Sequence, residues 1–302
     1  MRFSTIIRLS LGRAVISKNT HRFLKSSAVL NESEMSVHPI AESGFTSSEL
    51  YDRVRPGYSK EAVTFLLHKL GVVYGKNATS NMQPTHILEL GAGTGKFTRT
   101  LQDVLRGSNV EMITSEPVLS MRQEFAKIFP ELKIKDFSAE NIDLPDSSVD
   151  AVIAAQCFHW FANNESLSQI QRVLVPGGKL GLIWNSWDAS FPWIKELNEE
   201  VVLPSYWETN TPHEMSYEWK KVLDASGKFL PVEGDESQFK SQQFFSFEEL
   251  IDRLTSVSVI QVKNSSEKEL MKKRVELIWN KYNEKNKLVF PHVVKIYWAE
   301  RK

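Results

Sequence analysis

The feature that most constrains the fold is a glycine-rich turn within residues 86–97, which read HILELGAGTGKF. A short apolar run ends near an acidic residue, Glu89, and then breaks into glycines at every second position, Gly91, Gly93 and Gly95. Apolar residues at helical spacing follow, so the pattern predicts a strand, a tight turn and the start of a helix. Because glycine accepts positive φ angles and has no Cβ, the backbone there can approach a ligand closely. The turn is therefore predicted to cradle a small molecule.

The spacing of these glycines argues against a pyrophosphate-binding turn. The dinucleotide fingerprint Gly-x-Gly-x-x-Gly, started at Gly91, needs a third glycine where this chain has Lys96, and started at Gly93 it needs one at Thr98. A nicotinamide-dependent oxidoreductase is therefore disfavoured and ranks behind the two functions given at the end of this subsection. Tight binding of NADH would favour it again.

The residues after the turn predict an α/β sheet. The run 110–117 reads as a second strand, and Glu116 at its end lies about twenty residues after the last glycine, where a βαβ cofactor fold places an acid against ribose hydroxyls. An ordinary exposed glutamate at a strand end is the alternative. Residues 132–137 read as a third strand and 180–184 as a fifth. Between them, the continuous apolar run 151–155 is typical of a central parallel strand covered on both faces.

Several of these features occur together in one known family. The acid followed by three alternate glycines, the acid after the second strand and the Leu-x-Pro-Gly-Gly turn at 174–178 resemble the class I S-adenosylmethionine-dependent methyltransferases. Residues 155–161 and 290–301 are similar to the trans-aconitate-methyltransferase-like (type 11) branch. The resemblance covers about residues 45–302. It implies a doubly wound, mostly parallel, seven-stranded Rossmann-like sheet with a helical cap insertion, and S-adenosylmethionine as cofactor.

The resemblance also assigns cofactor contacts. Glu89 and the glycine turn would face the methionine part, Glu116 the ribose hydroxyls, and the loop 138–140 the adenine ring. The Tyr/Arg/Pro/Tyr cluster at 51–58 would lie over the cofactor, where an Arg or Tyr can meet its carboxylate; an ordinary helix entry is the alternative. The expected cofactor residues are Tyr51, Arg55, Glu89, Gly91, Ala92, Gly93, Gly95, Glu116, Ala139, Glu140 and Gln156.

The end of the fourth strand supplies the candidate reaction residues. In a parallel α/β sheet the carboxyl ends of the strands form the ligand crevice, and here they carry Gln-Cys-Phe-His-Trp-Phe at 156–161. His159 could polarise or deprotonate an acceptor oxygen, or it could be a packed, hydrogen-bonded imidazole. Trp160 and Phe161 are expected to line the pocket, since a sulfonium charge favours a π face. The Asn/Asp-Pro-Pro-Tyr/Phe motif of methyltransferases that act on nucleobase or glutamine amino groups does not occur in this stretch.

The chain changes character after the fifth strand. Residues 187–232 are rich in aromatics and interrupted by prolines, and we interpret them as a helical cap insertion that shapes the acceptor pocket. Trp187 is expected to line that pocket, although most of these aromatics could simply fill a small helical core. The expected domain, 45–302, then consists of a cofactor-binding half at 85–186, this cap, and C-terminal strands and helices at 233–302.

The first 35 residues have a composition of their own. Residues 1–30 contain six of the 37 basic residues and no Asp or Glu, which leaves 31 basic against 37 acidic residues in the rest. An Arg-, Ser- and Thr-rich leader without acids is typical of a mitochondrial transit peptide. We therefore expect residues 1–35 to direct the chain to the mitochondrial matrix; the alternative is a disordered basic tail on a cytoplasmic protein.

Composition excludes several other classes. The formal net charge is zero, which argues against nucleic-acid binding through a broad basic face. No apolar run is long enough for a membrane span. Cys157 is the single cysteine, so neither an internal disulfide nor a cysteine-based metal cluster can form. We also predict metal independence, because no His/Asp/Glu group has metal-ligand spacing. The oligomeric state is not predicted.

The sequence thus predicts a methyltransferase that acts on a small-molecule acceptor, with a carboxylic acid favoured by the resemblance alone. Holding donor and acceptor in line can supply about 7 to 11 kcal/mol, whereas a general base adds about 10² to 10⁴ in rate. The absence of an obvious catalytic base in the sequence therefore does not argue against an enzyme. The alternative is a non-catalytic methyltransferase-fold protein that serves as an assembly or interaction factor in mitochondria.

Overall fold

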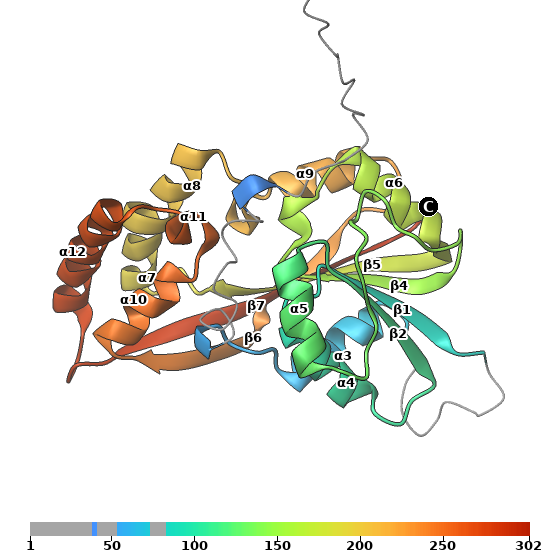
Figure 1. Ribbon diagram of the computed structural model, residues 1–302, viewed down its shortest axis with the longest axis horizontal. Helices are drawn as coiled ribbons and strands as arrows, with labels where there is room; N and C mark the ends of the chain where they lie inside the picture. The colour runs from blue at the N-terminus through green and yellow to red at the C-terminus, as the bar shows by residue number, and fades with distance from the viewer. Residues whose placement is uncertain (1–37, 41–52, 73–82) are drawn as a thin grey trace, which may run out of the picture. The chain divides into compact units, whose positions relative to one another are not determined.

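The computed structural model describes residues 38–40, 53–72 and 83–302 (Figure 1). The chain divides into two units, residues 1–35 and 36–302, and every described residue belongs to the second unit. The predicted leader and Tyr51 therefore lie outside the described residues, and their expected roles stay predictions.

Seven strands of the described chain form one sheet, in the order β3-β2-β1-β4-β5-β7-β6. The strands are β1 (Thr85–Leu90), β2 (Val110–Ser115), β3 (Ile134–Lys135), β4 (Val149–Ala155), β5 (Leu174–Trp187), β6 (Glu233–Phe245) and β7 (Leu288–Glu300). Neighbours from β3 to β5 pair in parallel, whereas β7 is antiparallel to both β5 and β6. This topology confirms the predicted doubly wound, mostly parallel sheet. Since strand order reverses between β1 and β4, their carboxyl ends mark the expected ligand crevice.

Helices cover both faces of the sheet, which explains the apolar central strands. Leu88 and Leu90 of β1 join one core with α6 (Asn164–Val173) and α9 (Glu218–Ala225). Ile87, which points to the other face, joins a second core with α3 (Lys60–Lys69) and α4 (Lys96–Leu105). Figure 1 shows these two helix pairs on opposite sides of the sheet. The remaining helix of this half is α5 (Leu119–Ile128).

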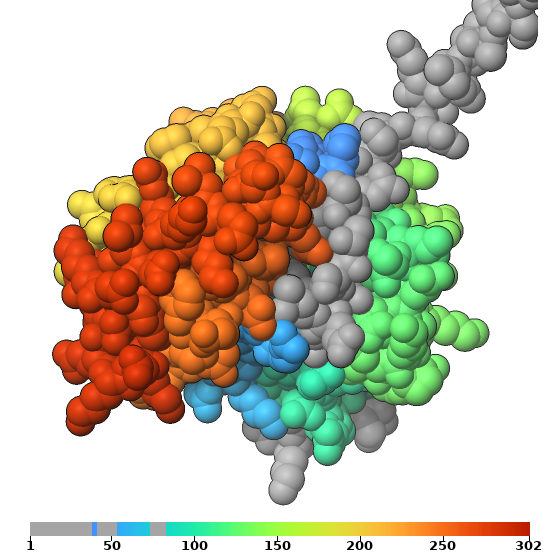
Figure 2. Space-filling model, turned by 60° about the vertical axis from the view of Figure 1, so that its left-hand side comes forward, coloured from blue at the N-terminus to red at the C-terminus, as the bar shows by residue number. Residues whose placement is uncertain are grey.

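A cap of short helices follows the sheet. It contains α7 (Pro192–Leu197), the π-helical turn η2 (Asn198–Val202), α8 (Leu203–Thr209), η3 (Glu214–Ser216), α10 (Phe247–Thr255), α11 (Ser258–Gln261) and α12 (Ser265–Tyr282). Their apolar side chains form one core with the ends of β6 and β7. In the space-filling view, the C-terminal helices and strand ends form a continuous orange-to-red surface (Figure 2).

The cap is larger than the sequence predicts. We expected it within 187–232 and assigned 233–302 to the sheet side, but α10, α11 and α12 pack into the same core as α7. Leu254 and Val275, for example, are buried together with Ile194. Helical periodicity identifies an apolar stripe but not the helix against which it packs. The helices of 187–232 and those of 246–282 therefore build a single layer around one core.

The Pro-Gly-Gly segment also differs from its expected form. We predicted a tight turn before the fifth strand, whereas β5 includes it as an irregularity: Val149 pairs with Leu174, and Ala151 with Lys179. Gly177 has a φ of +77°, and a methyl group added at Gly178 would lie 2.9 Å from a neighbouring carbonyl oxygen. The glycines thus let β5 bulge without leaving the sheet.

Candidate active site

The glycine turn joins the end of β1 to α4, and all three glycines have positive φ angles: +65° at Gly91, +58° at Gly93 and +88° at Gly95. A methyl group added at Gly91 would lie 2.8 Å from the Cys157 sulfur, and one at Gly95 would overlap the Phe129 ring. The same group at Gly93 would meet nothing within 4 Å. The outer two glycines are therefore required by packing, and the middle one leaves an open face for a ligand.

Glu89 lies below this turn and is only 1% exposed. Its Oε2 accepts a hydrogen bond of 2.8 Å from the Thr98 hydroxyl, whereas Oε1 has no hydrogen-bond partner among the described residues. Burial raises the pKa of Glu89 to about 8; the Thr98 hydrogen bond opposes this shift, and the nearby charge of Glu116 adds to it. A buried acceptor without a donor is costly, so Oε1 fits a cationic or N–H group of a ligand.

Glu116 follows β2 and is also buried. Its Oε2 accepts a hydrogen bond from the Gly93 N–H and its Oε1 accepts one from the Val118 N–H, each at 2.9 Å. Burial raises the Glu116 pKa, although these two hydrogen bonds and the charge of Arg122 oppose the shift. Each carboxylate oxygen keeps a further lone pair, which can accept a hydroxyl hydrogen. Glu116 thus fixes the glycine turn and remains able to bind a diol.

The expected adenine loop is held from two sides. Ala139 is buried in the core beside α6, and the Glu140 Oε1 accepts a hydrogen bond of 3.0 Å from the Asn163 amide. On the turn itself, the Ala92 N–H donates to the Ser115 carbonyl oxygen at 2.9 Å. These contacts fix the turn and the loop on both sides of the β2 end.

Gln156 is the first residue after β4 and has a φ of +63°, which is rare for a residue other than glycine. Its side-chain amide donates to the Asn185 carbonyl oxygen at 3.1 Å. Next to it, the Cys157 thiol donates to the Leu90 carbonyl oxygen at 3.2 Å, and burial raises the pKa of this thiol well above its usual value. Strained residues of this kind are common at ligand sites. Here Gln156 contacts β5, and the following Cys157 contacts the end of β1.

His159 lies in η1 (Phe158–Trp160), where part of its surface stays accessible but the ring is densely enclosed. Desolvation lowers the His159 pKa to about 3, and the charges of His213 and Arg55 contribute. The Trp184 indole N–H donates to His159 Nδ1 at 3.4 Å. The neutral ring then carries its proton on Nε2. His159 is thus placed to donate a hydrogen bond rather than to remove a proton.

The predicted pocket aromatics occupy different places. Phe161 stands edge to face with Phe158, and its Cε1 comes within 3.9 Å of a methyl group added at Gly91, so it lies beside the turn. The Trp160 ring centroid is 5.4 Å from that of His38. Trp187 lies in the cap, where it packs on Phe290 and under the guanidinium of Arg253.

Arg55 belongs to a bridging segment, residues 53–58. Its guanidinium donates to the Ser256 carbonyl oxygen at 2.8 Å, and Arg53 forms an ion pair of 2.7 Å with Asp252, so the segment contacts the cap. The Asn185 amide donates to the Gly57 carbonyl oxygen at 3.1 Å, which ties the other end to β5. The structure therefore places Arg55 between the two halves. A contact with the cofactor carboxylate stays a prediction.

Most of the predicted site residues form two groups. The first surrounds the glycine turn at the ends of β1, β2 and β4. The second lies toward the cap and comprises Arg55 and Trp187. The first group contains Glu89, Gly91, Ala92, Gly93, Gly95, Glu116, Gln156 and Phe161. Ala139 and Glu140 lie on the loop next to α6, and His159 and Trp160 lie in η1 after β4.

Sequence reasoning missed two buried polar side chains in the cap, Arg253 and His292. Arg253 carries a charge but is only 4% exposed, because it lies on the buried side of α10, next to Leu254 and three residues after Leu250. His292 is fully buried within β7, between apolar neighbours. A charged residue on an apolar helix face and a histidine in an apolar strand were the signals available.

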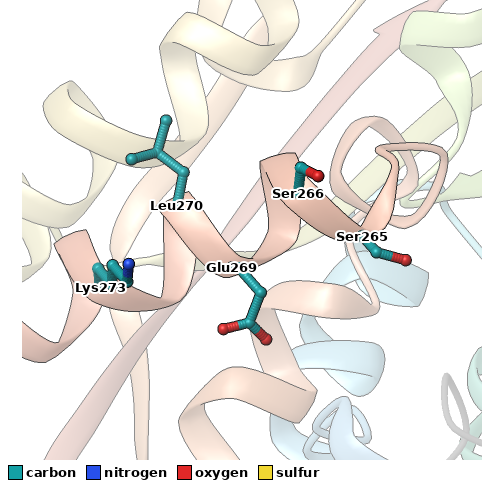
Figure 3. Close-up of a pocket in the computed structure, with 5 residues that line it drawn as sticks. All are labelled: Ser265, Ser266, Glu269, Leu270 and Lys273. Atoms are coloured by element: carbon teal, nitrogen blue, oxygen red, sulfur yellow. The ribbon is translucent and has the colours of Figure 1, made fainter.

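Membrane-spanning helices, metal sites and pockets are the other features to consider among the described residues. None of their helices has the length and apolar character required to cross a membrane, and no cluster of three or more His, Cys, Asp or Glu side chains among them could hold a metal ion. A shallow depression lies on the exposed side of α12, as Figure 3 shows. It is lined by Ser265, Ser266, Glu269, Leu270 and Lys273.

Residues 88–182 match a family model described as a methyltransferase domain. The chain is 34% identical over 221 residues to an uncharacterised methyltransferase of Schizosaccharomyces pombe, an alignment that covers 73% of this chain and 80% of that protein. A methyltransferase-like protein of the same yeast is 42% identical over 141 residues, which cover 47% of this chain. That alignment spans only about half of the relative, 53% of its length.

Solved structures show the same fold at low identity. A putative type II methyltransferase from Anaeromyxobacter dehalogenans superposes with a TM-score of 0.52 and 16% identity, covering 82% of this chain and 96% of that one. A putative methyltransferase from Anabaena variabilis gives a TM-score of 0.51 at 20% identity, with 78% and 96% covered. These likenesses concern the fold alone.

Proposed function

Because the chain belongs to the class I S-adenosylmethionine-dependent methyltransferases, we propose that it methylates a small-molecule acceptor, with a carboxylic acid as the leading class. One observation carries the donor side of this proposal. The partnerless Oε1 of Glu89, the open face of Gly93 and the carboxylate of Glu116 adjoin one glycine turn. An amine, a backbone contact and a ribose diol of one cofactor would match these groups.

The chain's own residues would hold the cofactor, which supplies a methyl group on a positively charged sulfur. Glu89 binds the amino group, Glu116 the ribose hydroxyls, and the loop with Ala139 and Glu140 borders the adenine. Phe161 lies beside the turn and presents an aromatic surface. A cationic group favours such a surface over an aliphatic one. Arg55, and Tyr51 outside the described residues, would meet the cofactor carboxylate.

The acceptor is positioned rather than activated. With a pKa of about 3, His159 is neutral near pH 7 and donates its Nε2 hydrogen to an acceptor oxygen. A carboxylate nucleophile is already ionised and requires no base. Positioning of donor and acceptor, which can lower the activation barrier by about 7 to 11 kcal/mol, is therefore the main catalytic effect. Support for a carboxylic acid comes from the resemblance to the trans-aconitate-like branch.

Calorimetry on the full chain tests the proposal. S-adenosylmethionine and S-adenosylhomocysteine should bind with micromolar affinity, and NADH should not. A panel of small organic acids with methyl-labelled donor should then give labelled ester. Cofactor binding without turnover across the panel would favour the non-catalytic assembly factor. If neither cofactor form bound, the methyltransferase proposal would be wrong for this chain.

We further propose that residues 1–35 direct the protein to the mitochondrial matrix. The support is their basic, acid-free composition. The full chain and a version starting at residue 36, each with a fluorescent protein at the C-terminus, provide the comparison. Mitochondrial signal from the full chain alone is expected. An equal cytoplasmic distribution of both would contradict the targeting role.

A further inference from the structure

One histidine of the cap, His213, has no role in the proposed donor site. It lies in the loop between α8 and η3, and its ring packs on that of Tyr206 at a centroid distance of 4.6 Å. The His213 Nδ1 is buried and has no hydrogen-bond partner among the described residues. A buried ring nitrogen in this state indicates a bound water or a ligand atom. The described part of the chain thus leaves this nitrogen available to a bound molecule.

Contacts around Trp184 bring this loop close to His159. The Trp184 indole N–H donates to His159 Nδ1 at 3.4 Å, and the Trp184 ring packs on that of Trp219 at a centroid distance of 4.8 Å. The Trp219 indole N–H donates in turn to the carbonyl oxygen of Glu214 at 3.0 Å, and Glu214 directly follows His213. The charge that His213 can carry also lowers the His159 pKa, which agrees with this proximity. Two imidazoles from separate segments therefore lie in one region.

The loop that carries His213 has an uncommon backbone conformation at both ends. Asn210 and Tyr217 have φ angles of +48° and +55°, in the left-handed region. Asparagine accepts this region readily, but a bulky tyrosine rarely adopts it. The Tyr217 hydroxyl accepts a hydrogen bond of 2.9 Å from Lys295 and donates one of 2.9 Å to Glu236, so contacts with β7 and β6 hold the strained residue. Strain of this kind is common at ligand sites, where the surrounding structure fixes a loop in place.

The two imidazoles can both act as neutral hydrogen-bond donors. Burial lowers the pKa of His213, and the pKa of His159 is about 3, so both rings are neutral near pH 7. The proton of a neutral imidazole lies on one of its two nitrogens, and a proton on His213 Nδ1 makes that atom a donor. The Nε2 of His159 is the second donor. A carboxylate oxygen has two lone pairs, so both donors can hold one oxygen and leave the other free to attack the methyl group.

We infer that His213 is an acceptor-binding residue, and that its Nδ1 holds the same acceptor oxygen as His159, the oxygen that is not methylated. The free oxygen forms the new bond to carbon, and the electron pair of the broken carbon–sulfur bond stays on the sulfur. The cap then contributes a group that orients the acceptor, since holding the reacting atoms in line is the main catalytic effect. This inference rests on the proposed function.

The test follows the ring nitrogens of His159 and His213 by NMR in the full chain with labelled histidine, saturated with S-adenosylhomocysteine. Acetate is the probe, and acetamide is its neutral control. Acetate should shift the signals of both rings with one dissociation constant, and acetamide should act much more weakly. Two different constants, or a shift of His159 alone, would overturn the inference and indicate a water at His213 Nδ1. The absence of a shift in both rings would overturn it as well.

Substitutions at position 213 give a second measure. His213→Leu removes the donor and should weaken acetate binding, read from the His159 signals, about tenfold. His213→Asn keeps an N–H near the place of Nδ1 and should recover part of that loss, which a merely structural role would not predict. His68→Leu, at an exposed position on α3, is the matched control and should leave the affinity unchanged. Equal acetate binding by His213→Leu and the unaltered chain would contradict the assignment.

Failure of the proposed function gives a different result. If the unaltered chain did not bind S-adenosylhomocysteine, the proposed function would be refuted. The acetate titration can then be repeated on the chain alone, because both rings belong to the protein, and it still decides whether His213 and His159 bind one oxygen.

Discussion

The glycine turn, which we propose as the donor site, and the cap bury polar groups in different ways. At the turn, backbone amides hold the Glu116 carboxylate, and both amides come from the adjoining glycine turn and loop. In the cap, Trp187 of β5 and His292 of β7 are neighbours in the strand ladder, and the Arg253 guanidinium from α10 lies over the Trp187 ring. A site built on backbone contacts stays the same when nearby side chains change. A site built from side chains changes with each substitution, so we expect cofactor binding to depend on the first region and acceptor choice on the second.

The largest effect should come from Gly91→Ala. The new methyl group would combine a φ of +65° with a 2.8 Å approach to the Cys157 sulfur. Affinity for S-adenosylhomocysteine should fall by two orders of magnitude or more, with about 3 kcal/mol lost in the free energy of unfolding. Gly107→Ala is the matched control, because its φ of +76° is similar but nothing lies within 4 Å. Urea unfolding and calorimetry of both variants measure the difference.

If Gly107→Ala were as harmful as Gly91→Ala, backbone strain alone would explain the effect. The turn would then not depend on its contact with Cys157, the second residue after β4.

Glu89 should make the empty protein pH-sensitive. Its folded pKa is about 8 against an ordinary 4.5, so the unfolded chain holds fewer protons between these values. Stability from this group is therefore complete below about pH 4.5 and is lost as the pH rises to about 8. Glu89→Gln should flatten urea-unfolding midpoints across this window. It should also weaken S-adenosylhomocysteine binding, because the carboxylate that receives the amine is gone. An unchanged pH dependence would show that Glu89 ionises normally.

Glu116→Ala should weaken S-adenosylhomocysteine binding by about 1 to 3 kcal/mol, because charged hydrogen bonds are lost. Glu111→Ala, an exposed position on the same strand, is the control and should leave the dissociation constant unchanged. Calorimetry of the three proteins gives the result. If the constant of Glu116→Ala matched that of the unaltered chain, Glu116 would not belong to the cofactor site.

The smallest effect is expected at His159. Once an acceptor acid is known, His159→Leu should lower kcat about tenfold by removing the Nε2 donor, without changing cofactor affinity. Since the His159 pKa is about 3, the rate should not follow its titration above about pH 5. A pH–rate profile with an inflection near pH 6 to 7 that disappears in the variant would show that His159 acts as a base instead.

These regions also differ in how far the sequence predicts them. The glycine spacing, the acid after the second strand and the apolar fourth strand are local patterns, and the sheet they predicted is confirmed by the strand order. Glu89, Gly93 and Glu116 lie around one turn because a parallel sheet brings the carboxyl ends of its strands together. Whether each of them contacts the cofactor stays a prediction.

The cap was not predictable to the same depth. The sequence indicated C-terminal strands and helices within 233–302, but the burial of these helices against Ile194 depends on contacts between segments far apart in the chain. Arg253 and His292 meet Trp187 only after β5, β7 and α10 have packed. Local sequence patterns do not predict contacts between distant segments. The prediction of a tight turn at the Pro-Gly-Gly segment was wrong for a related reason, because the bulge there depends on pairing with β4.

The most direct test is a crystal structure of the full chain with S-adenosylhomocysteine. We predict that the ligand amine lies within hydrogen-bond distance of Glu89 Oε1, that the ribose hydroxyls contact Glu116, and that the ligand backbone side faces Gly93. Arg253 and His292 should remain clear of the ligand. A ligand bound elsewhere, or one that leaves Glu89 Oε1 and Glu116 without contacts, would contradict the assignment of the donor site to this turn.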